Sequence, residues 1–251
     1  MYQKEKWIKL SGTVLCEIFT VFTIVTLLAG GEPDRLALAF GTILFVLLPV
    51  LLEKLFCCRI CLPVYIFALA YAIGPMLGHC WNFYYTISWW DKLLHFSGGV
   101  MFAIVGAYFF ELLTKRKDNF LAGAIFALCF SVAIAAVWEF LEFGADRLLG
   151  MDTQNDMVIT DITSYLLGDG IGVTGKLENI QTVIVDGAPL PVAGYIDIGL
   201  TDSMLDMILE SLGALITCLL LLLDKGRHPL IAEDRKAMSN HQFGHKRESV
   251  R

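Results

Sequence analysis

Six long apolar stretches alternate with short polar segments along the chain. They run over residues 10–30, 36–56, 62–84, 92–114, 119–145 and 202–223. The hydrocarbon core of a bilayer, about 30 Å thick, needs roughly 20 apolar residues in a helix, and each stretch is close to or above that length. The pattern therefore predicts an all-α polytopic membrane protein with six transmembrane helices.

Composition and charge strengthen this interpretation. Of the 251 residues, 56% are hydrophobic and only 18% are charged, and the mean hydropathy is +0.64. Soluble domains carry about 25% charged residues. The formal net charge is −6, and no nucleic-acid-binding motif occurs along the chain. We expect the lipid bilayer as the surrounding medium and no nucleic acid as a partner.

Basic residues orient the six stretches. Fifteen of the 19 lysines and arginines fall on one side if the stretches alternate across the membrane. Lysine and arginine favour the cytoplasmic side of short loops, so both termini are predicted to be cytoplasmic. The first stretch is too long for the apolar region of a signal peptide, and no clear cleavage site follows it. We expect it to remain as the first span.

The boundaries of the spans define the predicted domain organisation. Residues 1–224 form the transmembrane domain, and residues 225–251 form a cytoplasmic tail. A small extracytoplasmic insertion, residues 146–200, separates helices five and six and could act as a lid. Within it we expect a short surface helix over residues 156–172, and a β-hairpin around the Asp186-Gly187 turn.

Acidic and histidine side chains recur at helical spacing in three of the stretches. The segments WDKLLHFSGG, WEFLEFGAD and TDSMLDMILE contain Asp91, His95, Glu139, Glu142, Asp146, Asp202, Asp206 and Glu210. Spacings of three and four residues place each group on one helix face. Under the predicted orientation all three groups reach the outer leaflet. Ionisable side chains at membrane depth indicate a functional site.

Some of these residues have a structural alternative. Asp91 and Asp202 lie near helix N-termini, where a carboxylate can cap free amides and interact favourably with the helix dipole. Glu139 and its neighbours lie near a helix C-terminus, which disfavours negative charge. His95 alone could be a packed core residue, but Asp91 one turn earlier favours a ligand role.

So many neighbouring carboxylates must be neutralised, since like charges and burial both oppose ionisation. A divalent metal, shared protons or a cationic substrate could do this. Carboxylates with one imidazole suit Zn²⁺, Mn²⁺, Mg²⁺ or Ca²⁺. We assign four residues as metal ligands: Asp91, His95, Glu142 and Asp206. Glu139 or Glu210 is the expected general base, and three further candidates are His79, Asp146 and Asp202.

Two polar features lie outside this group. The small residues Ser97-Gly98-Gly99 either allow close helix packing, the favoured alternative, or leave room for a substrate chain. Glu17, inside the first stretch, could serve a proton relay or a polar contact with another helix. The sequence leaves the role of Glu17 open.

Three segments taken together resemble the YjdF-like group of uncharacterised bacterial inner-membrane proteins and, more distantly, the VanZ-like proteins. They are WWDKLLHFSGG, WEFLEFGADRLLGMDTQ and GLTDSMLDMILESLGAL, and the resemblance covers roughly residues 60–224. It implies a multi-pass protein of the bacterial cytoplasmic membrane. The polar core it implies contains Asp91, His95, Glu139, Glu142, Asp202 and Asp206. The group has no assigned reaction, so the resemblance supports architecture more than activity.

Three functions are consistent with these features. The first is a metal-dependent hydrolase or transferase that acts on a lipid or lipid-linked envelope substrate. The second is a transporter or channel for a cation or small cationic solute, and the third is a non-catalytic envelope-stress subunit. The inner half of the membrane offers only Glu17, with Glu53 and Glu111 near its edge. A transporter needs polar groups on both sides of the membrane, whereas an enzyme can have its acidic residues on one side only. We therefore favour the metal-dependent hydrolase or transferase.

Overall fold

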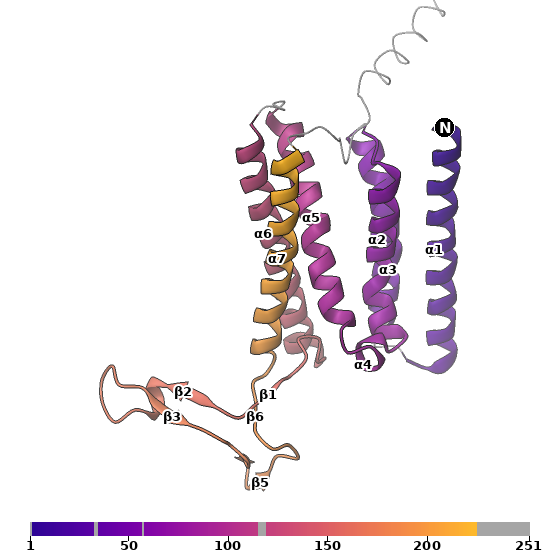
Figure 1. Ribbon diagram of the computed structural model, residues 1–251. Helices are drawn as coiled ribbons and strands as arrows, with labels where there is room; N and C mark the ends of the chain where they lie inside the picture. Colours follow the sequence, from indigo (N-terminus) through magenta and orange to yellow (C-terminus); the bar gives the residue numbers. More distant parts are fainter. Residues whose placement is uncertain (1, 33–34, 57, 115–118, 225–251) are drawn as a thin grey trace, which may run out of the picture. The chain divides into compact units, whose positions relative to one another are not determined.

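The computed structural model describes residues 2–32, 35–56, 58–114 and 119–224. Six helices in it are long and apolar enough to cross a membrane (Figure 1). They are α1 (Tyr2–Gly30), α2 (Leu36–Leu55), α3 (Leu62–Cys80), α5 (Trp90–Thr114), α6 (Phe120–Leu149) and α7 (Leu200–Asp224). The predicted fold class is confirmed. The predicted tail, residues 225–251, lies outside the described residues.

Helix boundaries differ by more than two residues from the apolar stretches at three points. α1 begins at Tyr2, because no proline or glycine interrupts the polar residues that precede its apolar part. α6 continues to Leu149, beyond the predicted end at residue 145, so that Asp146 also lies within the helix. α3 ends at Cys80, and the one-turn helix α4 (Phe83–Thr86) follows a left-handed Asn82 with φ 60°.

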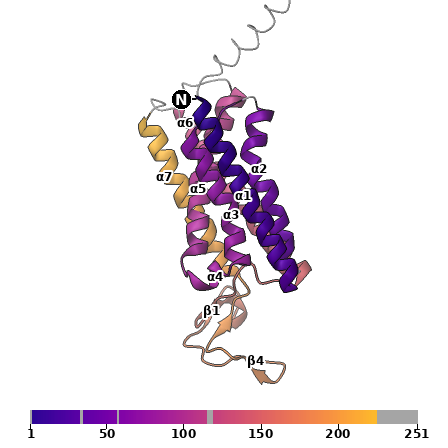
Figure 2. The same cartoon turned by 90° about the vertical axis from the view of Figure 1, so that its right-hand side faces the viewer.

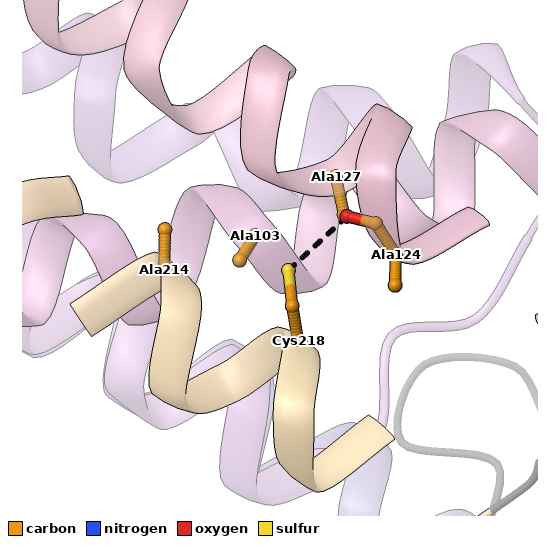
Figure 3. Close-up of a cluster of buried hydrophobic side chains, with 5 residues drawn as sticks. All are labelled: Ala103, Ala124, Ala127, Ala214 and Cys218. Carbon is orange, nitrogen blue, oxygen red and sulfur yellow. Dashed lines mark hydrogen bonds between the residues drawn. The ribbon is translucent and has the colours of Figure 1, made fainter. Parts of the chain in front are cut away.

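The chain divides into two compact units, residues 1–133 with 209–251, and residues 134–208. In the first unit, α1, α2 and α3 pack against one another (Figures 1 and 2). A second group of small buried side chains joins α5 to the parts of α6 and α7 in this unit: Ala103, Ala124, Ala127, Ala214 and Cys218 (Figure 3). Small side chains let membrane helices approach closely.

Polar contacts link α1 to the two helices beside it. Lys9 Nζ donates to Glu53 Oε1 at 2.6 Å and also to the carbonyl oxygen of Ile60. One turn further along α1, Thr13 Oγ1 lies 2.8 Å from Tyr65 Oη. These side chains satisfy one another where water is scarce, as buried polar groups must.

The second unit contains three two-stranded antiparallel sheets. They are β1 (Val158–Ile159) with β6 (Tyr195–Ile196), β2 (Ile162–Ser164) with β3 (Gly175–Leu177), and β4 (Ile184–Val185) with β5 (Ala188–Pro189). The β4–β5 hairpin is the predicted one. Its two turn residues, Asp186 and Gly187, have φ values of 53° and 82°, as the tight hairpin turn preferred by Asp-Gly requires.

The expected surface helix over residues 156–172 is wrong. That segment forms β1 and β2, followed by η2 (Tyr165–Leu167), a single 3₁₀ turn. Val158, Ile159, Ile162 and Thr163 are β-branched, which favours strands over helices. Their partners, β6 and β3, lie later in the chain, and a local pattern does not reveal such pairing.

Asp197 connects the β1–β6 sheet to the start of α7. Its Oδ1 accepts from the Met157 amide at 3.0 Å, and its Oδ2 accepts from the Thr201 amide at 2.8 Å. Burial alone would raise the pKa of this carboxyl. The hydrogen bonds from Thr201, Met157 and Gly199 outweigh burial, so the pKa lies below the ordinary aspartate value.

The depressed pKa of Asp197 predicts a loss of local stability in acid. The stabilising contribution is complete above the unfolded-state pKa of about 3.9, and it disappears as the pH falls through the lower folded-state value. We expect hydrogen exchange, corrected for intrinsic rates, to show the Met157 and Thr201 amides losing protection over that range. Asp197→Ala should abolish the pH dependence, whereas Glu178→Gln should retain it. Constant protection into strong acid would contradict this assignment.

Candidate functional site

Asp91 and His95 lie on the same face of α5, in its first two turns. His95 Nε2 is 3.6 Å from Asp91 Oδ1, and the histidine side chain is only 8% exposed. Asp91 Oδ2 accepts a hydrogen bond of 3.0 Å from Lys92 Nζ. The predicted proximity of Asp91 and His95 is therefore present, with a lysine as the adjoining cation.

Glu210 of α7 faces the other ring nitrogen of His95. Its Oε2 is 3.9 Å from His95 Nδ1, and its side chain is 4% exposed. Among the described residues none hydrogen-bonds to the buried Glu210 Oε1. Separations of 3.6 and 3.9 Å exceed normal hydrogen-bond lengths. The imidazole thus stands between two carboxylates, one near each ring nitrogen.

Glycines set the close contact between α5 and α7 in the first unit. A Cβ at Gly99 would overlap the carbonyl oxygen of Glu210 and lie 2.9 Å from the Ala214 amide nitrogen. A Cβ at Gly213 would overlap the carbonyl oxygen of Phe96 in the same way. This confirms the packing interpretation of Gly99. It also places Gly99, one turn after His95, at the level of Glu210 and Ala214.

Three predicted site residues lie in the last part of α6. Glu139 is buried, with 6% exposure. Glu142 is half-buried, and its Oε1 accepts a 2.8 Å hydrogen bond from Trp138 Nε1 one turn earlier. Asp146 accepts bonds of 2.6 Å from both the amide and the hydroxyl of Thr153, and one of 3.0 Å from the Gln154 amide. Asp146 thus holds the turn that follows α6.

The remaining acidic candidates lie on α7. Asp202 and Asp206 are buried, with 6% and 2% exposure. Because α7 is continuous from Leu200 to Asp224, Asp202, Asp206 and Glu210 share one helix face at four-residue spacing. Asp202 lies in the first turn, where the helix dipole favours a negative charge.

Residues 154 and 155 contact α7 within the second unit and were not predicted from the sequence. Gln154 Nε2 donates to Ser203 Oγ at 2.6 Å, and Asn155 Nδ2 lies 3.4 Å from Asp202 Oδ2. Asn155 has a left-handed backbone, φ 46°, which asparagine tolerates better than most residues. The polar run Thr153-Gln154-Asn155 directly after α6 was the available signal.

His79 lies in the last turn of α3, and its ring contacts Tyr84 edge to face, with centroids 5.4 Å apart. A Cβ at Gly78 would overlap the Tyr84 ring, so this end of α3 packs tightly on α4. The contacts described for His79 are therefore with an aromatic ring. It stays a further candidate.

A family profile described as "Predicted membrane protein (DUF2238)" matches residues 12–227. The chain belongs to this family. Every candidate site residue lies inside the matched range, and the resemblance to the YjdF-like group is compatible with the assignment.

One curated relative of this DUF2238 protein is an uncharacterised protein of Thermotoga maritima. The two are 32% identical over 102 residues, which is 38% of this chain and 52% of the relative. The chain thus matches about half the length of that relative. No solved structure matches the chain. The comparisons establish an integral membrane protein family and assign it no reaction.

Proposed function

We propose that this protein is a metal-dependent hydrolase or transferase of the bacterial cytoplasmic membrane, with Asp91, His95 and Asp206 as ligands of a divalent ion. The observation that carries the proposal is the surroundings of His95. Each ring nitrogen of this buried imidazole faces a carboxylate, Asp91 on one side and Glu210 on the other. The Glu210 carboxylate has a buried oxygen to which no described group donates a hydrogen bond.

The distances fit an ion beside one ring nitrogen. Two donors that each lie about 2.1 Å from a tetrahedral ion are roughly 3.4 Å apart, close to the 3.6 Å between His95 Nε2 and Asp91 Oδ1. A ligating histidine usually directs its other N–H toward a carboxylate. Glu210, near Nδ1, is suited to that role, because it would fix the tautomer and orientation of the ring.

Asp206 is proposed as the third ligand from helix register. Gly99 of α5 packs at Glu210 and Ala214 of α7, and the two helices run in the same direction under the alternating topology. Asp206 precedes Glu210 by one turn, as Asp91 precedes His95. Asp206 is therefore the residue of α7 that we propose to complete the ligand set begun by Asp91 and His95.

Charge supports a cation at this place. Buried carboxylates need positive partners, and Lys92 is the described cation bonded to Asp91. The insertion, residues 146–200, contains two basic residues, Arg147 and Lys176, and eight acidic residues: Asp146, Asp152, Asp156, Asp161, Asp169, Glu178, Asp186 and Asp197. Such a charge distribution concentrates cations, so it favours delivery of a divalent ion.

A bound ion would activate water as a nucleophile at neutral pH. The water oxygen would attack the ester or phosphate centre of the substrate while its proton passes to a nearby carboxylate. The bond from that centre to the leaving oxygen would break, and the protonated carboxylate would return the proton to the leaving group as an alcohol. Glu210 is the first candidate for this base and Glu139 the second. Because these residues belong to membrane-spanning helices, a lipid or lipid-linked substrate is the class that reaches them from the bilayer.

Reconstituted protein tests the activity. In nanodiscs we expect release of water-soluble product from lipid phosphates or lipid esters after addition of Zn²⁺, Mn²⁺, Mg²⁺ or Ca²⁺, and its loss with a chelator. Glu210→Gln should reduce the rate by about 10²-fold or more, whereas Glu111→Gln, at an exposed position of α5, should leave it unchanged. Turnover that is insensitive to chelator and to His95→Ala would contradict the proposal. Cation flux into liposomes without turnover would favour a transporter.

A further inference from the structure

α1 carries a line of buried polar side chains along the face that packs on α2 and α3. Its members are Lys9, Thr13, Thr20 and Thr23, with Glu17 between the second and the third. Positions three and four residues apart lie next to one another on a helix. Polar groups thus follow one another along a helix that the membrane would otherwise keep apolar.

Glu17 is the ionisable member near the middle of the 29-residue α1. Its Oε1 is buried, and within the described part of the chain no group forms a hydrogen bond with that oxygen. The polar contact with another helix, which the sequence left open, is therefore not made by this oxygen. A charged carboxylate at membrane depth is costly, so the group needs a proton or an external partner.

Hydrogen-bonding side chains lie on both sides of Glu17. One turn toward the N-terminus Thr13 Oγ1 is 2.8 Å from Tyr65 Oη, and beyond it Lys9 pairs with Glu53. On the other side Thr20 follows at i+3. Hydroxyl groups both donate and accept, so they can pass a proton along the helix face.

The helices α1, α2 and α3, which pack against one another, carry the charged and titratable groups of this part of the protein. Besides Glu17 these groups are Tyr2, Lys4, Glu5, Lys6, Lys9 and Cys16 on α1, Glu53 and Lys54 on α2, and Tyr65, Tyr71, His79 and Cys80 on α3. Lys9 is engaged with Glu53 and Ile60. A metal ion prefers several oxygen ligands, and Glu17 contributes one carboxylate among hydroxyl and thiol groups. A proton is the ligand that this composition suits.

We propose that Glu17 is a reversible proton-binding site inside the membrane, reached along the hydroxyl groups of Thr13 and Tyr65. The event is the addition of one proton to the carboxylate to give a carboxylic acid, and its return on release. No other reactant is needed. The site lies on helices other than those of the proposed metal ligands and does not depend on them.

Infrared difference spectroscopy of the full chain in nanodiscs tests this site. Across a pH titration, the wild-type protein should show the C=O stretch of a protonated carboxylic acid that Glu17→Gln lacks. Glu17→Asp should keep the band at a shifted frequency, and it also serves if Glu17→Gln does not fold. Glu111→Gln, at an exposed carboxylate, is the matched control and should retain the Glu17 band.

Identical titration spectra of the wild type and Glu17→Gln would overturn the proposal. A change in oligomeric mass on Glu17→Gln, without loss of a carboxylic acid band, would also overturn it and assign Glu17 to a contact with a second copy. A carboxylic acid band that appears only when a metal cation is bound would also overturn the proposal. Tyr65→Phe should keep the band and slow its appearance after a pH jump.

Discussion

Replacing Gly99 by alanine is expected to destabilise the protein by about 3 kcal/mol, the upper end for overpacking. The added Cβ would overlap the carbonyl oxygen of Glu210 and approach the Ala214 amide. Both neighbours are backbone, so no side chain can rotate away, and α5 and α7 must move apart. Thermal and denaturant unfolding in detergent would measure the change, and the separation of Glu210 from His95 should weaken metal binding as well.

Gly41→Ala is the matched control for this substitution. Gly41 lies inside α2, and in the part of the chain that the structure describes nothing lies within 4 Å of the position its Cβ would take. Alanine is favoured over glycine in a helix by about 1 kcal/mol, so this variant should be as stable as the wild type or more stable. Equal stability of Gly99→Ala and Gly41→Ala would contradict the α5–α7 contact.

Lys9→Met is expected to cost about 3 kcal/mol of unfolding free energy, because it leaves the carboxylate of Glu53 without its cation. The Lys9 side chain is 10% exposed and that of Glu53 24%, so the pair is mostly buried. Removing one partner of a buried pair costs about 3–5 kcal/mol, and the partial exposure of Glu53 favours the lower end. Chemical denaturation of the purified protein would measure the loss.

The double variant Lys9→Met with Glu53→Gln distinguishes the contribution of the ion pair to stability from that of the surrounding side-chain packing. With both charges removed no ion stays buried, so most of the lost stability should return. The Ile60 amide, which donates to Glu53 Oε1 at 2.9 Å, can then donate to the glutamine carbonyl. A double variant that is as unstable as Lys9→Met, or less stable, would show that the ion pair does not carry the effect.

Most of the fold follows from local features of the sequence. Apolar runs of about 20 residues predict spans because a bilayer leaves the backbone few other ways to satisfy its hydrogen bonds. The Asp186-Gly187 turn predicts its hairpin because both residues tolerate positive φ. The strands β1 and β2 were missed, since each forms with a partner that lies later in the chain.

In the candidate site, too, contacts within one helix could be predicted from the sequence, and contacts between distant segments could not. The proximity of Asp91 and His95, and the bond from Trp138 to Glu142, are i,i+4 relationships of a helix. The approach of Glu210 to His95 depends instead on how α5 and α7 pack. The donors from Thr153 and Gln154 that hold Asp146 come from the turn after α6, and no periodic pattern marks such contacts.

Metal content of the purified protein tests the central claim most directly. After purification without chelators, or after incubation with Zn²⁺, Mn²⁺, Mg²⁺ and Ca²⁺ in turn, elemental mass spectrometry should find about one divalent ion per chain. Folded His95→Ala and Asp206→Asn variants should lose that ion, and Glu111→Gln should keep it. No bound metal in the wild type under any of these conditions, or equal metal content in the His95→Ala variant, would contradict the account.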